Sequence, residues 1–401
     1  MSAATGPALT EGAQAQTPRG KILAMSAIAG AVVTNIYCNQ PILPLISQGF
    51  RVGSTQVDLV AGATLLGFAT GLFFLLPLGD GRDRKKLVLL QVILAFFFAA
   101  GAALSTSLWM LVVASYLLGI VSCVPQQLVP FAAVMSRPSE RGRSVGTVVS
   151  GIMVGILAGR ALSGAIGSHW GWRAVFGFEA ALMVPIYFIA SALLPTVKPT
   201  TDLAYPKLLA TMPKLLGKHQ AIRDSVVIQS LLWACFNAFW VNLAAMLSEG
   251  PLHLGSQWAG SFGIIGAAGA FAASLGGRAV DRVGPRRVIG LSIALVVVAY
   301  AVLALPAASL LPLVAGVILL DLGVQSALVS NQARAFAADP AAQGRINSIY
   351  MTSTFVGGAI GAVVSGWLMA RFGWPGVCAF GVAVGLVALA AHGAGGRRIQ
   401  K

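Results

Sequence analysis

The sequence has few charged residues. They make up only 10% of its 401 residues, and only 12 are acidic, whereas soluble domains usually carry about 25% charged residues. With 57% hydrophobic residues, the chain has too little polar material to cover soluble domains in water. The composition excludes a soluble protein and indicates a polytopic membrane protein.

Cysteine and histidine are also scarce. The four cysteines, Cys38, Cys123, Cys235 and Cys378, lie in or beside apolar stretches, so they form neither a disulfide framework nor a zinc site. Four histidines lie in loops or at helix ends without a partner at ligand spacing: His169, His219, His253 and His392. No phosphate-binding GxxxxGK[ST] sequence occurs. We therefore expect no metal, no cofactor, no enzymatic activity and no ATP-driven pump.

Long apolar runs dominate the chain. A helix crosses the hydrocarbon core in about 20 apolar residues, and continuous runs of this kind exclude a β-barrel. The sequence predicts twelve spans, at 22–46, 56–78, 87–104, 108–134, 144–166, 174–194, 225–247, 257–277, 288–305, 312–333, 346–369 and 377–394. The expected fold is an all-α integral membrane protein with twelve transmembrane helices.

The basic residues give this protein an orientation. If the N-terminus is cytoplasmic, 23 of the 27 Lys and Arg residues fall on the cytoplasmic side, as the positive-inside rule requires. Only Arg51, Arg173 and Arg371 then face outward, and Arg160 lies inside a span. This bias accounts for the net charge of +15 without a nucleic-acid partner. We expect a multi-pass protein of the plasma (inner) membrane with both termini cytoplasmic.

The two halves of the chain repeat each other. At an offset near 202, Gly171-Trp172 recurs as Gly373-Trp374 and Asn35 as Asn237. Parallel repeats of this kind are typical of one large class of secondary transporters. The sequence thus predicts two six-helix bundles, 22–194 and 225–394, related by a pseudo-twofold axis, with a cytoplasmic linker at 195–224 and cytoplasmic tails at 1–21 and 395–401.

Glycines recur at helical spacing in each half. Gly151, Gly155 and Gly159 stand at every fourth position, and Gly357, Gly361 and Ser365 repeat the pattern. Small residues at this spacing let helix backbones approach closely. The pattern fits either fixed packing or helices that slide during a conformational cycle.

A charged turn between spans 8 and 9 carries a family resemblance. The segment GRAVDRVGPRR, Gly277 to Arg287, resembles the loop motif of the major facilitator superfamily, and LPLGDGRDRKK, Leu76 to Lys86, is a degraded first copy. The resemblance covers about 370 residues and implies a cytoplasmic latch that stabilises the outward-facing state. The residues expected to form this gate are Asp80, Arg84, Gly277, Asp281, Arg282, Gly284, Arg286 and Arg287.

Within that superfamily the chain looks like a relative of the drug/proton antiporters. It lacks two marks of that branch, since Ser115 stands where an arginine is usual in helix 4 and Gly159-Arg160 replaces a Gly-Pro pair in helix 5. The resemblance implies alternating-access transport of a small organic molecule by a functional monomer, with proton-coupled efflux as the first expectation. Proton-coupled import and a non-transporting receptor on the same scaffold remain alternatives.

Three charged residues fall within predicted spans: Arg160, Glu179 and Asp321. A charge at mid-membrane costs about 2.5–3.5 kcal/mol, so such residues tend to be paired or functional. An Arg160–Glu179 pair would join neighbouring helices, whereas an Arg160–Asp321 pair would bridge the halves, and the sequence favours neither. Asp321 is the first candidate for carrying a proton, with Arg160 and Glu179 as the other coupling candidates.

Polar residues on helices 1, 4, 7 and 10 predict a substrate cavity. The resemblance implies that these four helices line the central cavity, and each carries amides, hydroxyls or aromatic rings on one face. The expected cavity residues are Asn35, Tyr37, Asn39, Ser115, Ser122, Gln126, Trp233, Asn237, Trp240, Gln325 and Gln332. For any single residue, hydrogen bonding between helices is the commoner role. The set suits a neutral or cationic amphiphile better than a polyanion.

Overall fold

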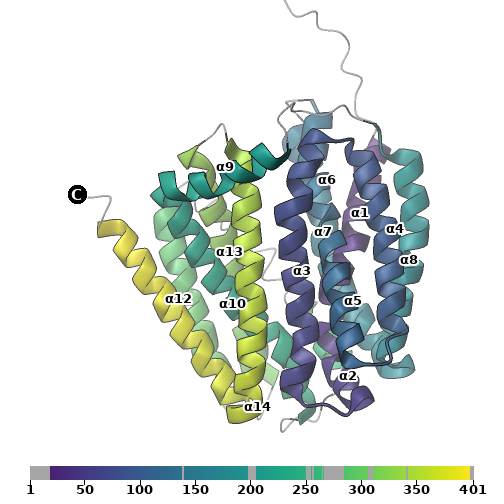
Figure 1. The fold of residues 1–401 in the computed structure, drawn as a ribbon. Coiled ribbons are helices and arrows are strands. Elements are labelled where there is room, and N and C mark those ends of the chain that lie inside the picture. The colour runs from purple at the N-terminus through teal and green to yellow at the C-terminus, as the bar shows by residue number, and fades with distance from the viewer. Residues whose placement is uncertain are drawn as a thin grey trace, which may run out of the picture.

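The structure is a computed structural model that describes residues 19–137, 140–196, 205–249, 254, 257–263, 265, 284–305, 310–339 and 342–397. These residues form a bundle of helices without strands (Figure 1). The first half contains α1 (Arg19–Tyr37), η1 (Gln40–Ile42), α2 (Leu43–Phe50), α3 (Ser54–Gly81), α4 (Arg84–Ala103), α5 (Leu108–Val121), α6 (Val124–Met135), α7 (Arg141–Trp170) and α8 (Trp172–Leu193). The second half contains α9 (Tyr205–Lys218), α10 (Gln220–Glu249), α12 (Pro285–Leu303), α13 (Leu310–Ala338) and α14 (Gln343–Arg397).

Membrane-length helices occur where the apolar runs predict them. Among the described residues, ten helical segments are long and apolar enough to cross a bilayer. One of these, Gly344–Ala394, is a hairpin, because Gly373 within it has φ 63° and ψ −162° and turns the chain back on itself (Figure 1). The predicted span 257–277 lies mostly outside the described residues, so the count of twelve stays a prediction.

Two predicted spans are broken rather than continuous. The run at 22–46 divides after Tyr37 into α1, η1 and α2, and Pro41 lies at the start of η1. The run at 108–134 divides at Ser122 and Cys123 into α5 and α6, where Pro125 opens α6. Proline has no backbone N–H to continue a helix and is favoured in a first turn.

Helices pack first within their own half. In the first half α1 packs along α7 and α4 along α8; in the second, α10 and α12 each pack along α14. The halves meet chiefly where α3 lies beside α14, near the centre of Figure 1. The linker predicted at 195–224 contains a helix of its own, α9, and α10 begins within it at Gln220.

The repeated small residues mark equivalent helix crossings. Gly155 of α7 lies against the backbone of Gly30 in α1, and Gly357 of α14 lies against that of Ser230 in α10. One turn further along, Gly361 lies against Ala234. A side-chain carbon at any of these three glycines would collide with backbone atoms, so the close approach requires glycine. The sequence repeat therefore corresponds to a repeated contact between helices.

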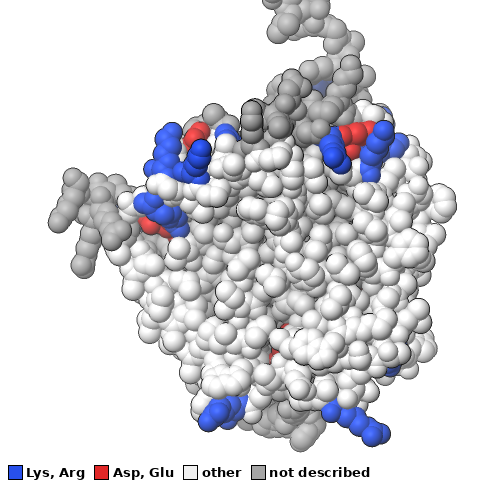
Figure 2. All heavy atoms as spheres, in the orientation of Figure 1, with Lys and Arg blue, Asp and Glu red and all other residues white. Residues whose placement is uncertain are grey.

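Charged side chains gather at the two ends of the bundle. Figure 2 shows Lys and Arg concentrated at the end that carries α9, with few at the opposite end beside α2; we call these the α9 end and the α2 end. Arg51, Arg173 and Arg371, the three residues predicted to face outward, belong to the α2 end, at the end of α2, the start of α8 and the bend of α14. At the α9 end, Arg334 forms an ion pair with Asp224 at 2.8 Å.

Candidate functional site

A small cavity lies between the two halves at the centre of the bundle. Its volume is about 100 Å³. Both halves contribute polar and aromatic residues to its lining: Tyr37 of α1, Phe68 of α3, Gln126 of α6 and Arg160 of α7 from the first, and Trp233 and Phe236 of α10, Asp321 and Gln325 of α13 and Thr354 and Phe355 of α14 from the second. The remaining lining is aliphatic.

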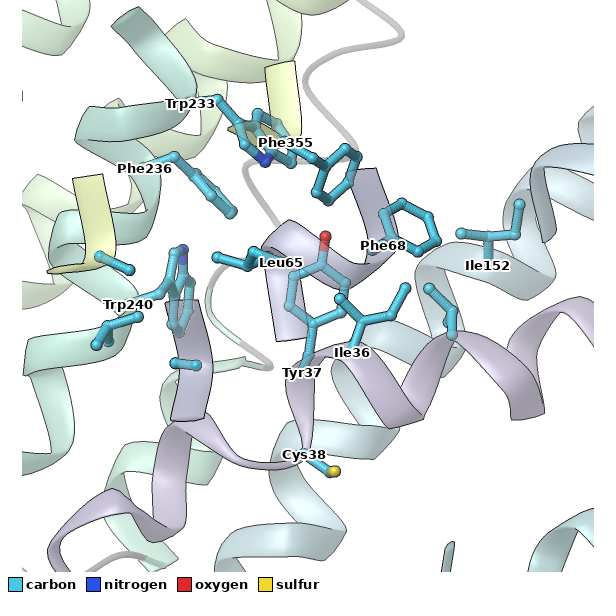
Figure 3. Packing of buried hydrophobic residues seen from close by; sticks show 14 of the residues in the cluster. Ile36, Tyr37, Cys38, Leu65, Phe68, Ile152, Trp233, Phe236, Trp240 and Phe355 are labelled. Carbon is cyan, nitrogen blue, oxygen red and sulfur yellow. The ribbon is translucent and has the colours of Figure 1, made fainter. Parts of the chain in front are cut away.

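Aromatic rings form one wall of this cavity and join the halves. Phe68 packs edge-on against Phe355 with ring centroids 4.5 Å apart, and Phe355 lies 5.4 Å from Trp233. Trp233 in turn stacks on Phe236 at 4.8 Å. Figure 3 shows this chain of rings around the hydroxyl of Tyr37. The wall gives the cavity a largely apolar surface.

Arg160 is held rigidly beside the cavity. Its side chain is only 2% exposed, and its Nε donates a hydrogen bond to Oε1 of Gln40 at 3.2 Å. The guanidinium carbon lies 3.8 Å from the ring centroid of Trp240 and 4.9 Å from that of Tyr37, both distances typical of cation–π contacts. Gln40 reaches Arg160 from η1, directly after the break in the first span.

Asp321 faces the same cavity from the other half. It is 4% exposed and lies one helical turn before Gln325 on α13, as their spacing predicts. Within the described part of the chain, neither Asp321 nor Glu179 lies within ion-pair distance, 4.0 Å, of Arg160. Opposite charges thus share one enclosed space without direct contact.

Glu179 lies elsewhere. It borders a separate groove of about 570 Å³ between α1, α7 and α8, where Thr34 donates a hydrogen bond to its Oε2 at 2.5 Å. Gly151, Gly155 and Gly159 line the same groove. Of the two arrangements that the sequence leaves open, the structure therefore places Arg160 with Asp321 at one cavity and Glu179 apart from both.

A second cavity leads from the centre toward the α9 end. Its volume is about 410 Å³, and Met212 of α9 borders it. Gln126 borders both cavities, so they adjoin. Gln332, also predicted as a cavity residue, lines this second space and donates from Nε2 to Oδ1 of Asn347 at 2.8 Å. Arg84 and Arg345 add positive charge to its walls.

Several residues predicted to line the cavity face neighbouring helices instead. Asn35 donates to the sulfur of Met183 at 3.8 Å, and Asn39 donates to Oγ1 of Thr64 at 2.8 Å. The two asparagines contact different helices, α8 and α3, and α1 ends between them at Tyr37. They belong to the packing of the first half.

The same correction applies to residues of the fourth predicted span, which forms α5 and α6, and of the seventh, which forms α10. Ser115 is buried in α5, and Ser122 donates to the carbonyl of Leu118. Of the three residues predicted for this span, only Gln126 lines the cavity. On α10, Asn237 donates to the carbonyl of Trp233 and lies against Gly358 of α14. Trp240 reaches the site only through its ring contact with Arg160.

The predicted gate is described only in part. Gly277, Asp281 and Arg282 lie outside the described residues, as does the side chain of Asp80. Nε of Arg84, which is buried, donates to the carbonyl of Gly79 at 2.9 Å.

In the second-half copy of the motif, a glycine and two arginines are described. Gly284 precedes α12 with φ 84°, a conformation that favours glycine. Nη2 of Arg286 lies 3.5 Å from the carbonyl of His392 in α14, and Arg287 is exposed. These contacts fix the start of α12, whereas the latch itself stays a prediction.

The sequence analysis missed two buried residues, Gln40 beside Arg160 and Asp58 at a contact between the halves. Gln40 shows no signal besides its place before Pro41. Asp58 lies near the edge of the predicted span at 56–78, yet it is 4% exposed and lies against Gly366 of α14, where a side-chain carbon would collide with its Oδ2. Asp58 therefore brings a carboxyl group of the first half to the backbone of the second.

A bundle of membrane-length helices whose two halves enclose a cavity lined by a buried arginine and a buried aspartate has the architecture of a membrane transporter. The family model of the Major Facilitator Superfamily matches residues 25–320 and 253–394. The chain belongs to the major facilitator superfamily.

Relatives with similar sequences carry transporter names. The chain is 33% identical over 368 residues to the putative uncharacterized transporter YgaY of Escherichia coli K12, covering 92% of this chain and 93% of that one. It is 30% identical over 359 residues to the probable transporter SCO4007 of Streptomyces coelicolor, covering 89% and 83%. The protein is a membrane transporter.

Solved structures share the fold at low sequence identity. The nucleoside transporter NupG superposes with a TM-score of 0.77 at 14% identity, covering 94% of this chain and 98% of that one. A bacterial homologue of the human lysosomal transporter Spinster, in an inward-facing and occupied conformation, gives a TM-score of 0.76 at 15% identity, covering 94% and 96%.

Proposed function

We propose that the protein is a secondary active transporter that exports a small organic molecule in exchange for protons. The observation that carries this proposal is the placement of Arg160 and Asp321, from opposite halves, on one enclosed cavity. Intramembrane charges are costly and usually mark a transport pathway. Because the two residues belong to different halves, a rocking motion of one half against the other changes the distance between them.

Asp321 is the proposed coupling residue. Of the described groups that line the cavity, Tyr37, Arg160 and Asp321 can change or carry charge, and Asp321 is the only carboxyl group among them. A proton and a cationic group of a substrate compete for that carboxylate, so the site holds one or the other. Such competition is sufficient for exchange. When neither a proton nor a substrate is bound, the positive charge of Arg160 stabilises the charged form of Asp321.

Alternating access assigns roles to the two ends. The α9 end carries most of the basic side chains (Figure 2), and the positive-inside rule makes it cytoplasmic. The second cavity, with Gln126 at its junction, is then the route between the centre and the cytoplasm. On this assignment the contacts between the halves nearer the α2 end, including Arg160 with Trp240 and Asp58 against Gly366, close the outer side.

Import is the second candidate. A segment of 155 residues is 30% identical to a D-xylose transporter of Levilactobacillus brevis, covering 37% of this chain and 33% of that one. The fold also matches that of a peptide transporter with a TM-score of 0.73 at 15% identity, covering 95% of each chain. A compact cavity is compatible with a small metabolite that enters together with a proton. The same helices and Asp321 could carry out either import or export.

Flux into proteoliposomes distinguishes these mechanisms. Purified protein is reconstituted and tested with radiolabelled drugs, sugars and amino acids under imposed pH gradients. Exchange predicts accumulation when the lumen is acidic, whereas import with a proton predicts accumulation when the outside is acidic. If the flux of every tested compound is independent of both pH gradients, proton coupling is contradicted.

The coupling residue is tested in the same vesicles. Asp321→Asn is expected to abolish accumulation driven by the pH gradient, because an amide cannot take up and release the proton. Glu179→Gln removes an equally buried carboxyl group that faces another groove, and we expect it to retain gradient-driven flux. If Asp321→Asn accumulates substrate with unchanged dependence on the gradient, Asp321 is not the coupling residue.

A further inference from the structure

Three polar atoms of the central cavity have no hydrogen-bond partner among the described residues. They are Nη2 of Arg160, Nε1 of Trp233 and Oδ2 of Asp321, and all three are buried. Buried polar groups in folded proteins are paired in the great majority of cases, so each exception requires an explanation. Two of the atoms are donors and one is an acceptor. A ligand that pairs with all three therefore carries hydrogen-bond acceptors for Arg160 and Trp233 and a donor for Asp321.

The donor side is built to receive a carboxylate. Gln40 accepts from Nε of Arg160, and the ring of Trp240 lies 3.8 Å from the guanidinium carbon. These contacts fix the plane of the guanidinium group and leave Nη2 free at the cavity. A planar guanidinium edge matches the two oxygens of a carboxylate, and the indole N–H of Trp233 offers a further donor.

The acceptor side favours an ammonium group. Asp321 presents its unpartnered Oδ2 from the opposite half. A ligand that carries only a negative charge is attracted by Arg160 but repelled by Asp321, and a purely cationic ligand meets the reverse. A ligand with both charges satisfies both residues and bridges the space between them.

The rest of the cavity sets the size and polarity of the ligand. Its volume of about 100 Å³ is smaller than the roughly 300–1,000 Å³ typical of drug-sized pockets. Phe68, Phe236 and Phe355 contribute apolar rings, whereas a sugar requires many polar partners. The body of the ligand is therefore small and apolar.

From these observations we infer that the substrate is a small zwitterion with an apolar side chain, of the α-amino acid class. Arg160 and Trp233 bind its carboxylate, Asp321 binds its ammonium group, and the aromatic wall contacts its side chain. The inference rests on the proposed transport function and adds the class of substrate. It also makes the substrate ammonium the group that competes with the proton at Asp321.

Binding to the purified full-length protein in nanodiscs tests the inference without requiring transport. Isothermal titration compares L-leucine with two analogues of the same skeleton, 4-methylpentanoate, which lacks the amine, and 3-methylbutylamine, which lacks the carboxylate. L-phenylalanine, 3-phenylpropionate and phenethylamine form a second series. In at least one series, we expect the amino acid to bind at least about tenfold more tightly than either analogue, a difference of about 1.4 kcal/mol.

Variants assign each charge to its residue. Arg160→Gln is expected to remove the preference for the amino acid over the amine, and Asp321→Asn the preference over the carboxylate. Glu179→Gln serves as a control for removing a buried carboxyl group and is expected to keep both preferences. Circular dichroism and the melting temperature of each variant establish that it is folded, and Arg160→Lys, which keeps the charge, is expected to restore part of the first preference.

Three outcomes would overturn the inference. These are an absence of amino-acid binding in both series, an analogue that binds as tightly as its parent, and preferences that survive in folded variants at Arg160 and Asp321. The transport function is judged separately. Gradient-driven flux of a cationic drug without amino-acid binding supports the proposed transport function and overturns the substrate class. Selective amino-acid binding without gradient-driven flux supports the substrate class and overturns the transport function.

Discussion

Arg160 of α7 and Asp321 of α13 line the same buried cavity but form no ion pair within the described part of the protein. Gln40 and two aromatic rings contact the guanidinium group, which points to them and forms no ion pair with the carboxylate. The separation leaves both charges available to a ligand or a proton. This relationship between the halves is the basis of the functional proposals, and the predictions below test the structure that maintains it.

Replacing Gln40 is expected to loosen Arg160. Gln40→Leu removes the acceptor for Nε of Arg160, and a hydrogen bond to a charged group contributes about 1.5–3 kcal/mol. We expect the Kd for substrate to rise about tenfold or more, measured by titration. Gln48→Leu changes an exposed glutamine on the neighbouring helix α2 and should leave the Kd unchanged. Equal effects of the two variants would show that Gln40 does not position Arg160.

The crossing of α1 and α7 is expected to tolerate no added side chain. Gly155→Ala places a methyl group against the backbone of Gly30, and overpacking of this kind costs about 1–3 kcal/mol. Gly146→Ala is the matched control in the same helix, because no atom lies within 4 Å of the added carbon. There alanine raises helix propensity by as much as about 1 kcal/mol. Thermal unfolding in detergent should rank Gly146→Ala at or above the wild type and Gly155→Ala below it.

The hydroxyl of Thr34 is expected to stabilise the buried Glu179. Thr34→Val keeps the shape of the side chain but removes the donor 2.5 Å from Oε2 of Glu179. Leaving a buried acceptor unpaired costs about 1–3 kcal/mol, so the free energy of unfolding should fall by that amount. Thr34→Ser retains the hydroxyl and should recover most of the loss. If valine is as stable as the wild type while serine is destabilised, the methyl packing of Thr34 and not its hydroxyl is what stabilises the protein.

The ion pair between Arg334 and Asp224 is expected to join α13 to α10 at the α9 end. The side chains are 14% and 19% exposed, and their charged atoms lie 2.8 Å apart. A double-mutant cycle with Arg334→Ala and Asp224→Ala should give a coupling energy of about 1 kcal/mol. Because salt screens partly exposed charges, the coupling should shrink at about 1 M NaCl. A coupling indistinguishable from zero at low salt would contradict a stabilising role.

Most of the helical architecture could be predicted from apolar runs. Helices α3, α4, α7, α8, α10, α12 and α13 coincide with predicted spans to within a few residues, because a bilayer requires about 20 apolar residues per crossing whatever the neighbours are. The repeat of small residues likewise predicted close helix contacts, which Gly155 and Gly357 make. Local composition is sufficient for such features.

The cavity could be predicted only where a helix is continuous. Asp321 and Gln325 lie together on the cavity because α13 is unbroken, so their spacing fixes a common face. Asn35 and Asn39 have the same spacing but contact different helices, α8 and α3, and the helix ends between them at Tyr37. Periodicity is a reliable guide to a shared face only as long as the hydrogen-bond ladder continues.

The sequence by itself determined the membrane class and the positions of the apolar helices, since each follows from local composition and the thickness of a bilayer, and matching residues at a fixed offset indicated the repetition of one half in the other. Only the tertiary structure decided that Arg160 faces Asp321 across a cavity while Glu179 pairs with Thr34. Which of several buried charges meet depends on how helices far apart in the chain rotate and pack, and no local pattern encodes that rotation.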